Sequence, residues 1–233
     1  MNYLQLVQSL HQILRADNNQ LGAAPTTVAS QDGLLGELVY FIRQSWADIQ
    51  NDTVRWRFMW GENTLTLLGG RDTVQPTAIP DFESYILANS DSTGRFITMY
   101  RDSIADETIV RYVPYPAWQQ SYLTRGERGV GQPANFTILP DNRLKFDMVA
   151  DVNYTVRLNY RKAAQILADD SDTPNAPSRH HMSIVWWAVA NYYCTTRDGA
   201  EGLRQRAVLQ LRREMQRMYN EQGDDAVVYE GGV

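Results

Sequence analysis

The chain has 233 residues, of which 43% are hydrophobic and 11% are aromatic. This apolar content suffices for one large domain or two small ones and excludes a wholly disordered chain. The 27 acidic residues exceed the 22 basic ones, giving a net charge of −5, which is not the balance of a generally basic nucleic-acid-binding protein. All but two of the basic residues are arginine, whose planar head suits fixed pairs across an interface.

Two helical patterns occupy the first 51 residues. Apolar residues recur at steps of three and four from Tyr3 to Leu14, and again from Leu34 to Ile49 after a linker that contains Pro25. Each pattern has one apolar stripe that needs a partner. We therefore expect two antiparallel helices in this part of the chain.

The apolar period changes to two after residue 53. From Val54 to Trp60 every second residue is apolar, with Arg55, Arg57 and Met59 between. Gly61-Glu62-Asn63 is typical of a turn into a second strand, Thr64–Leu68. The pattern predicts a hairpin with an aromatic face. Further strands are predicted at Phe96–Arg101, Thr108–Val113, Asn135–Leu139, Arg143–Asp147 and Tyr154–Tyr160. Six or seven short strands imply a compact antiparallel sheet or sandwich.

Helical patterns lie between and after the strands. Pro114–Trp118 predicts a short helical turn, and Ala163–Ala168 predicts a short helix. A strongly apolar helix is expected from Ser178 to about Arg197, followed by a last helix with apolar residues from Leu203 to Met218 at steps of four and three. The single cysteine, Cys194, lies in the apolar run and is expected to be buried.

These elements predict an α+β fold in which a helical bundle is interrupted by an inserted domain. Residues 1–52 and 162–222 would form a discontinuous helical domain, and residues 53–161 an inserted antiparallel β-domain. Residues 223–233 would form an extended C-terminal tail. No leader or apolar run of 18 residues is present, so we expect neither secretion by a standard signal nor a membrane partner.

No motif for catalysis, a cofactor or a metal is apparent in the sequence. The glycine-rich run 126–131 has no Gly-Lys-Ser/Thr ending and is expected to be a loop. His180 and His181 point about 100° apart on a helix, and Cys194 lies nearly four turns away, so the three cannot close on one ion. The acidic run 169–172 lacks the glycine and glutamate of a calcium loop. We therefore expect no catalytic, cofactor or metal site.

Two charged segments lie at the C-terminal end. The last predicted helix carries Arg204, Arg206, Arg212, Arg213 and Arg217, which could complement the helix dipole or form a docking surface for a subunit. The tail carries Asp224, Asp225, Ala226, Val227, Val228, Tyr229 and Glu230. Fixing about 11 tail residues costs roughly 10 to 20 kcal/mol, while burying its three largest apolar side chains returns only about 5 to 9 kcal/mol. A tail of this kind would need a partner that also offers main-chain hydrogen bonds.

The order of features resembles the head-to-tail adaptor (connector, neck) proteins of tailed bacteriophages. The matching stretches are 1–7, the second helix with Ile42–Gln50 followed by Trp56-Arg57-Phe58, Tyr115–Trp118, Gly131-Gln132-Pro133, and Pro177–His181 into Ile184–Ala188. The resemblance covers nearly the whole chain, and the order of the motifs carries it.

The resemblance implies a non-enzymatic virion protein of the neck, made in the bacterial cytoplasm. It implies a dodecameric ring below the portal, which extends the DNA channel and joins the capsid to the tail. Its partners would be other copies of the chain, the portal protein, and a tail or further neck protein. The C-terminal tail would reach onto the portal, and the arginines would contact a subunit or the portal. Net acidity suits a conduit through which genomic DNA slides without specific binding.

Two other functions stay open on the sequence alone. A phage neck protein with glycan-hydrolase activity would need two carboxylates about 5 to 9 Å apart. Carboxylates such as Glu83, Asp102 and Asp106 could pair, but the sequence singles out no pair among its 27 acidic residues. A DNA-binding module could stack bases on aromatic side chains, although such aromatics more often form a core or an interface. The aromatic residues concerned are Trp56, Phe58, Trp60, Tyr112, Tyr115 and Trp118.

Overall fold

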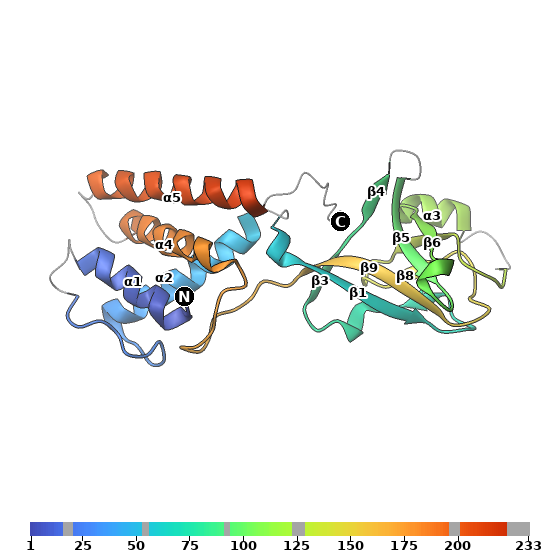
Figure 1. Ribbon diagram of the computed structural model, residues 1–233, viewed down its shortest axis with the longest axis horizontal. Helices are drawn as coiled ribbons and strands as arrows, with labels where there is room; N and C mark the ends of the chain where they lie inside the picture. The colour runs from blue at the N-terminus through green and yellow to red at the C-terminus, as the bar shows by residue number, and fades with distance from the viewer. Residues whose placement is uncertain (16–20, 53–55, 91–93, 123–128, 196–200, 223–233) are drawn as a thin grey trace. The chain divides into compact units, whose positions relative to one another are not determined.

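The computed structural model describes residues 1–15, 21–52, 56–90, 94–122, 129–195 and 201–222. The described residues form two compact units. Among the described residues, 1–59 and 164–222 make a helical unit, and 60–163 make a sheet unit (Figure 1). Each has its own buried core, and each is described separately below.

The helical unit is built around one apolar helix. Its elements are α1 (Tyr3–Arg15), α2 (Gly33–Asp52), α4 (His181–Thr195) and α5 (Glu201–Gln222). Helix α4 contacts α1, α2 and α5, which explains why Ile184, Val185 and Ala188 are completely buried. The predicted N-terminal helices and the two late helices are therefore confirmed.

The sheet unit contains one nine-stranded sheet with the path β1-β9-β5-β6-β7-β8-β2. Strand β3 pairs with β9, and β4 pairs with β5. All pairs are antiparallel except β6 and β7, and β1 contacts β2, so the two ends of the path meet. The elements are β1 (Trp60–Leu67), β2 (Thr73–Val74), β3 (Phe82–Ile86), β4 (Ala88–Ser90), β5 (Gly94–Tyr100), β6 (Thr108–Tyr112), α3 (Tyr115–Tyr122), β7 (Asn135–Ile138), β8 (Leu144–Phe146) and β9 (Tyr154–Lys162).

The predicted fold class, a helical bundle interrupted by an inserted antiparallel β-domain, is wrong. The described residues form a mixed α+β structure with five helices, one of which lies in the sheet unit, and a large sheet whose path almost closes on itself. The sequence pattern missed β2, β3 and β4, because two of them have only two or three residues and the third is bulged. The predicted tail, residues 223–233, lies outside the described residues.

The predicted aromatic hairpin is also wrong. Gly61-Glu62-Asn63 lies inside β1 and pairs with β9. Gly61 is needed for packing, since a Cβ at this position would lie 2.5 Å from the Tyr160 ring. Trp56 and Phe58 belong to the helical unit, where their rings stack. The alternation of apolar residues before Trp60 did not indicate a strand, because Arg57–Met59 form a short 3-10 helix and β1 begins only after it.

Two smaller predictions also fail. Residues 163–168 are not helical, and the main chain of Gln165 binds a side chain of α2 instead. The Gln50 side chain accepts from the Gln165 N–H (2.7 Å) and donates to its carbonyl oxygen (3.0 Å). Cys194 is exposed rather than buried, because it points away from the face of α4 that carries Tyr192 and Tyr193 into the core.

Candidate functional site

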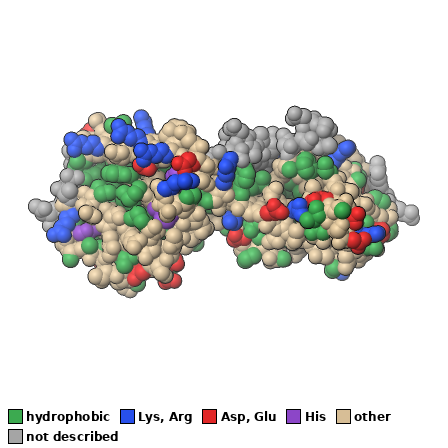
Figure 2. Space-filling view, in the orientation of Figure 1, with side chains coloured by type: hydrophobic (Ala, Val, Ile, Leu, Met, Phe, Trp, Pro, Cys, Tyr) green, Lys and Arg blue, Asp and Glu red, His purple; other side chains and the backbone are tan. Residues whose placement is uncertain are grey.

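Helix α5 presents the predicted arginines on its outer side. Its inner side carries Ala207, Met215 and Met218, which are buried. The exposed arginines are Arg204, Arg206, Arg212, Arg213 and Arg217. In Figure 2 Lys and Arg side chains gather over α5, with hydrophobic side chains beside them. The amphipathic spacing of α5 thus turns every one of these guanidinium groups away from the core.

The arginines of α5 fall into two groups. Arg204 pairs with Glu201 at 3.8 Å, and Arg217 pairs with Glu214 at 3.0 Å, both within the helix. Arg206, Arg212 and Arg213 form no ion pair with any other residue that the structure describes. These three lie three or four positions from Leu209, whose side chain is 55% exposed. They therefore share one patch of the helix surface, which we call the arginine face: Arg206, Leu209, Arg212 and Arg213.

A groove of about 410 Å³ runs along one side of the arginine face. Its lining includes Val208, Leu209 and the stems of Arg204 and Arg212. An exposed leucine ringed by unpaired guanidinium groups has the make-up of a protein interface, in which an apolar centre is surrounded by charge.

The C-terminal half of α5 is fixed to the rest of the helical unit. The Tyr219 ring packs against Trp56 with centroids 4.8 Å apart, and its hydroxyl donates a hydrogen bond to Asp52. Burial, together with the hydrogen bond and charge of Asp52, raises the pKa of Tyr219 to about 12. Glu221 binds both Arg179 (2.6 Å) and His180 (3.2 Å). The arginine face is therefore held on a firmly anchored helix.

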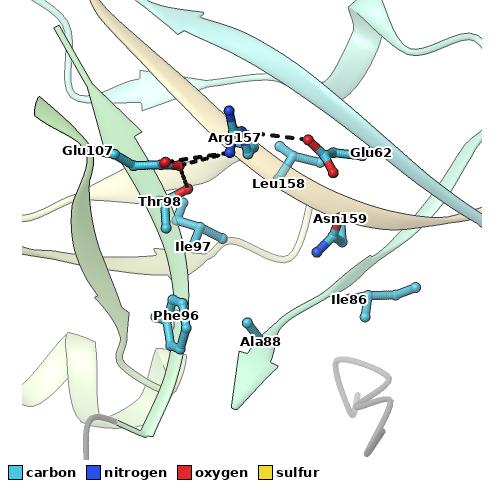
Figure 3. Close-up of a pocket in the computed structure, with 10 residues that line it drawn as sticks. All are labelled: Glu62, Ile86, Ala88, Phe96, Ile97, Thr98, Glu107, Arg157, Leu158 and Asn159. Carbon is cyan, nitrogen blue, oxygen red and sulfur yellow. Dashed lines mark hydrogen bonds and ion pairs between the residues drawn. The ribbon is translucent and has the colours of Figure 1, made fainter. Parts of the chain in front are cut away.

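A second candidate site is a cavity of about 290 Å³ in the sheet unit, lined by Ile86, Phe96 and Asn159 among others (Figure 3). Arg157 of β9 lies between two glutamates at this cavity. Its Nε is 3.5 Å from Glu62, and its Nη1 is 3.4 Å from Glu107. The Thr98 hydroxyl also donates to Glu107. These contacts link side chains of β1, β5 and β9 with Glu107, the residue before β6. We call these four residues, Glu62, Thr98, Glu107 and Arg157, the Arg157 network.

The sequence did not single out this network. Arg157 lies on the polar side of the alternating strand β9, which the sequence pattern shows. Its partners are 95 and 50 positions away, and only the pairing of β1, β9 and β5 brings them together. The carboxylates that were considered for a glycan-hydrolase pair lie elsewhere: Glu83 pairs with Arg161, and Asp102 pairs with Arg101, while Asp106 is exposed in a short 3-10 helix.

Both histidines at the start of α4 have structural contacts. His180 binds Glu221, as described above. His181 is buried, with its Nε2 2.9 Å from the Ala176 carbonyl oxygen and its Nδ1 2.7 Å from the Met1 nitrogen. Burial lowers the pKa of His181 below its usual value. Across the described ranges no group of three His, Cys, Asp or Glu side chains is arranged to hold a metal ion.

Most of the aromatic residues proposed for base stacking contact other side chains of the protein. Trp56 and Trp118 are fully buried. Phe58 stacks on both Trp46 and Trp56, and the Trp118 ring stacks on Tyr122 at 4.3 Å. These contacts agree with the interpretation of the aromatics as core residues. The other predicted site, Asp224 to Glu230 in the C-terminal tail, lies outside the described residues.

Comparison with known proteins identifies the family. The family model for the SU10 adaptor protein matches residues 1–230, whereas no curated protein matches the chain. Within the described ranges, none of the helices is both long and apolar enough to cross a membrane. The chain belongs to the SU10 adaptor protein family, a phage head-to-tail adaptor family, and the resemblance inferred from the sequence is confirmed.

Proposed function

We propose that this member of the SU10 adaptor family is a structural protein of the virion neck, which forms a dodecameric ring below the portal. The ring would extend the DNA channel and join the capsid to the tail. The observation that carries this proposal is the family match over nearly the whole chain. The arginine face supports it, because an anchored helix with an exposed leucine and three unpaired arginines suits contact with another protein.

The partners in this proposal are other copies of the chain, the portal protein, and a tail or further neck protein. Genomic DNA would pass through the ring without specific binding. The net charge of −5 supports this role, because a mostly acidic conduit does not hold phosphates, whereas a basic one would. The buried aromatics support it as well, since Trp56 and Trp118 offer no free face on which a base could stack.

A structural role also suits the charges of the sheet unit. Glu62 and Glu107 both bind Arg157, so neither is a free carboxylate in the cavity. A glycosidase needs one carboxyl group that donates a proton and a second that acts as base or nucleophile. The Arg157 network is therefore better explained as a means of holding strands together than as a catalytic pair.

The C-terminal tail is proposed to bind the portal. Helix α5 ends at Gln222, and the sequence that follows combines acidic and apolar residues. A chain that lacks residues 223–233 should keep the thermal melting temperature of the full-length protein, because no described contact is removed. It should no longer bind the portal in a pull-down. Unchanged portal binding by the truncated chain would refute the role of the tail.

Electron microscopy of the protein mixed with its portal tests the proposed function as a whole. The expected result is a ring of adaptor density on one end of the portal, coaxial with the channel. Class averages that show bare portals at saturating adaptor concentration would overturn the proposal.

A further inference from the structure

Helix α2 carries an exposed surface that combines apolar and acidic side chains. Its exposed side includes Leu34 (37% exposed) and Tyr40 (59% exposed), with Glu37 between them. Asp48 follows two turns later and accepts a hydrogen bond from Gln44 at 2.7 Å. Residues 34, 37, 40 and 48 fall on one side of an α-helix. We call them the acidic face of α2.

The charges of the two helices are opposite. Helix α2 has three acidic residues against one cation, Arg43, whereas α5 has five arginines against three glutamates. Neither Glu37 nor Asp48 forms an ion pair with another residue that the structure describes. The arginine face has positive charges without an ion pair around Leu209, and the acidic face has Glu37 before Tyr40 and Asp48 after it along the helix. The two faces are therefore complementary in charge.

The two faces belong to helices on different sides of α4. Helix α4 contacts α5 as well as α1 and α2, and it lies between α5 and α1 in Figure 1. Near their C-terminal ends α2 and α5 meet through Asp52 and Tyr219. The arginine face is on the outer side of α5, away from α4, so it is not covered by the acidic face of its own chain.

We propose that the arginine face of one copy binds the acidic face of α2 in the next copy. Leu209 would pack against Tyr40 at the centre of two parallel helices. Glu37 and Asp48 lie on opposite sides of Tyr40, about 16 Å apart along α2, so Arg206 would face Glu37, and Arg212 and Arg213 would face Asp48. Different surfaces then meet at each contact, which is the head-to-tail arrangement that closes into a ring. A contact between two copies of α5 is disfavoured, because it would bring unpaired arginines together. This inference rests on the proposed ring and names the surfaces that form it.

Site-directed cross-linking tests the contact. Two single variants, Leu209→Cys and Tyr40→Cys, are made in a Cys194→Ser background, because the native cysteine is exposed. They are mixed and treated with a short bismaleimide, both alone and with the portal. The expected product is a dimer that contains one copy of each variant. A chain with both substitutions should give a ladder of higher oligomers. The matched control replaces Tyr40→Cys by Ile166→Cys, whose site is 75% exposed in the same unit, and should give no such product.

Other cross-linking results would overturn the proposal. They are dimers formed by Leu209→Cys alone, cross-links from this position to the portal only, or no product under any condition. Electron microscopy of the same mixtures separates this failure from failure of the proposed function. Rings on the portal without the cross-link would refute the contact and leave the adaptor role intact, whereas absent rings would refute the role itself.

Charge exchange gives an independent test. Arg212→Glu with Arg213→Glu should weaken ring formation at least about tenfold, since like charges would then meet at the rim. Adding Asp48→Arg to the same chain should restore ring formation, because the reversed residues 212 and 213 would again face an opposite charge while Arg206 keeps its partner Glu37. Failure of the triple variant to regain rings, while its thermal melt stays like that of the double variant, would contradict the pairing.

Discussion

Arginine has different surroundings in the two units of this protein. In the sheet unit, Arg157 lies between Glu62 and Glu107, and Arg161 pairs with Glu83 at 3.2 Å. On α5, Arg206, Arg212 and Arg213 point to solvent without an ion pair among the described residues. The difference indicates that Arg157 and Arg161 hold strands of the sheet unit together, whereas the arginines of the arginine face are available to a partner.

The largest expected effect comes from breaking the core of the sheet unit. Phe136 is completely buried and packs against the rings of Tyr112 and Phe146. Phe136→Ala should lower the free energy of unfolding by about 3 to 5 kcal/mol, as measured by denaturant titration with circular dichroism. Ile109→Ala, at a position that is 46% exposed on β6, is the control. A loss below about 1 kcal/mol for Phe136→Ala would contradict this view of the core.

A smaller effect is expected from the central arginine of the sheet network. Arg157→Met keeps an unbranched side chain but leaves Glu107, which is only 20% exposed, without its cation. We expect a loss of about 2 kcal/mol in the free energy of unfolding. Arg213→Met, the matched change on the arginine face, should stay within about 0.5 kcal/mol of the unmodified chain. Equal losses for the two variants would remove the distinction between paired and unpaired arginines.

The smallest effect concerns the anchor of α5 and depends on pH. The raised pKa of Tyr219, about 12, means that the folded state holds this proton more tightly than the unfolded chain, whose tyrosines titrate near pH 10. The contribution of Tyr219 to stability is therefore complete below pH 10 and is lost as the pH rises toward 12. Tyr219→Phe should be less stable at neutral pH and should lose less stability over this range. Parallel curves from pH 9 to 12 in thermal melts would contradict the assignment.

The helices of this protein were largely predictable from the sequence. A 3.6-residue apolar period is local, and Ile184, Val185 and Ala188 of α4 fall on its expected buried face. The arginine face was also predictable, because α5 has a regular pattern that places its charges outward. The predictions that failed concern features that depend on contacts between residues far apart in the sequence. Gly61 has the signature of a turn, yet it is explained only by the Tyr160 ring across the strand pair. The Arg157 network likewise required the sheet order, which no local pattern of β9 contains.

The most direct test compares ring formation and stability for two charge-reversal variants. Portals mixed with the unmodified chain, with Arg212→Glu/Arg213→Glu, or with the control Arg15→Glu/Arg71→Glu are counted in electron micrographs for adaptor rings, and each protein is melted in parallel. We predict that all three proteins melt within about 2 °C of one another. Rings should be present for the unmodified chain and the control and absent for the Arg212/Arg213 variant. Rings at the unmodified level for that variant would contradict the account, as would a fall in its melting temperature that matches the loss of rings.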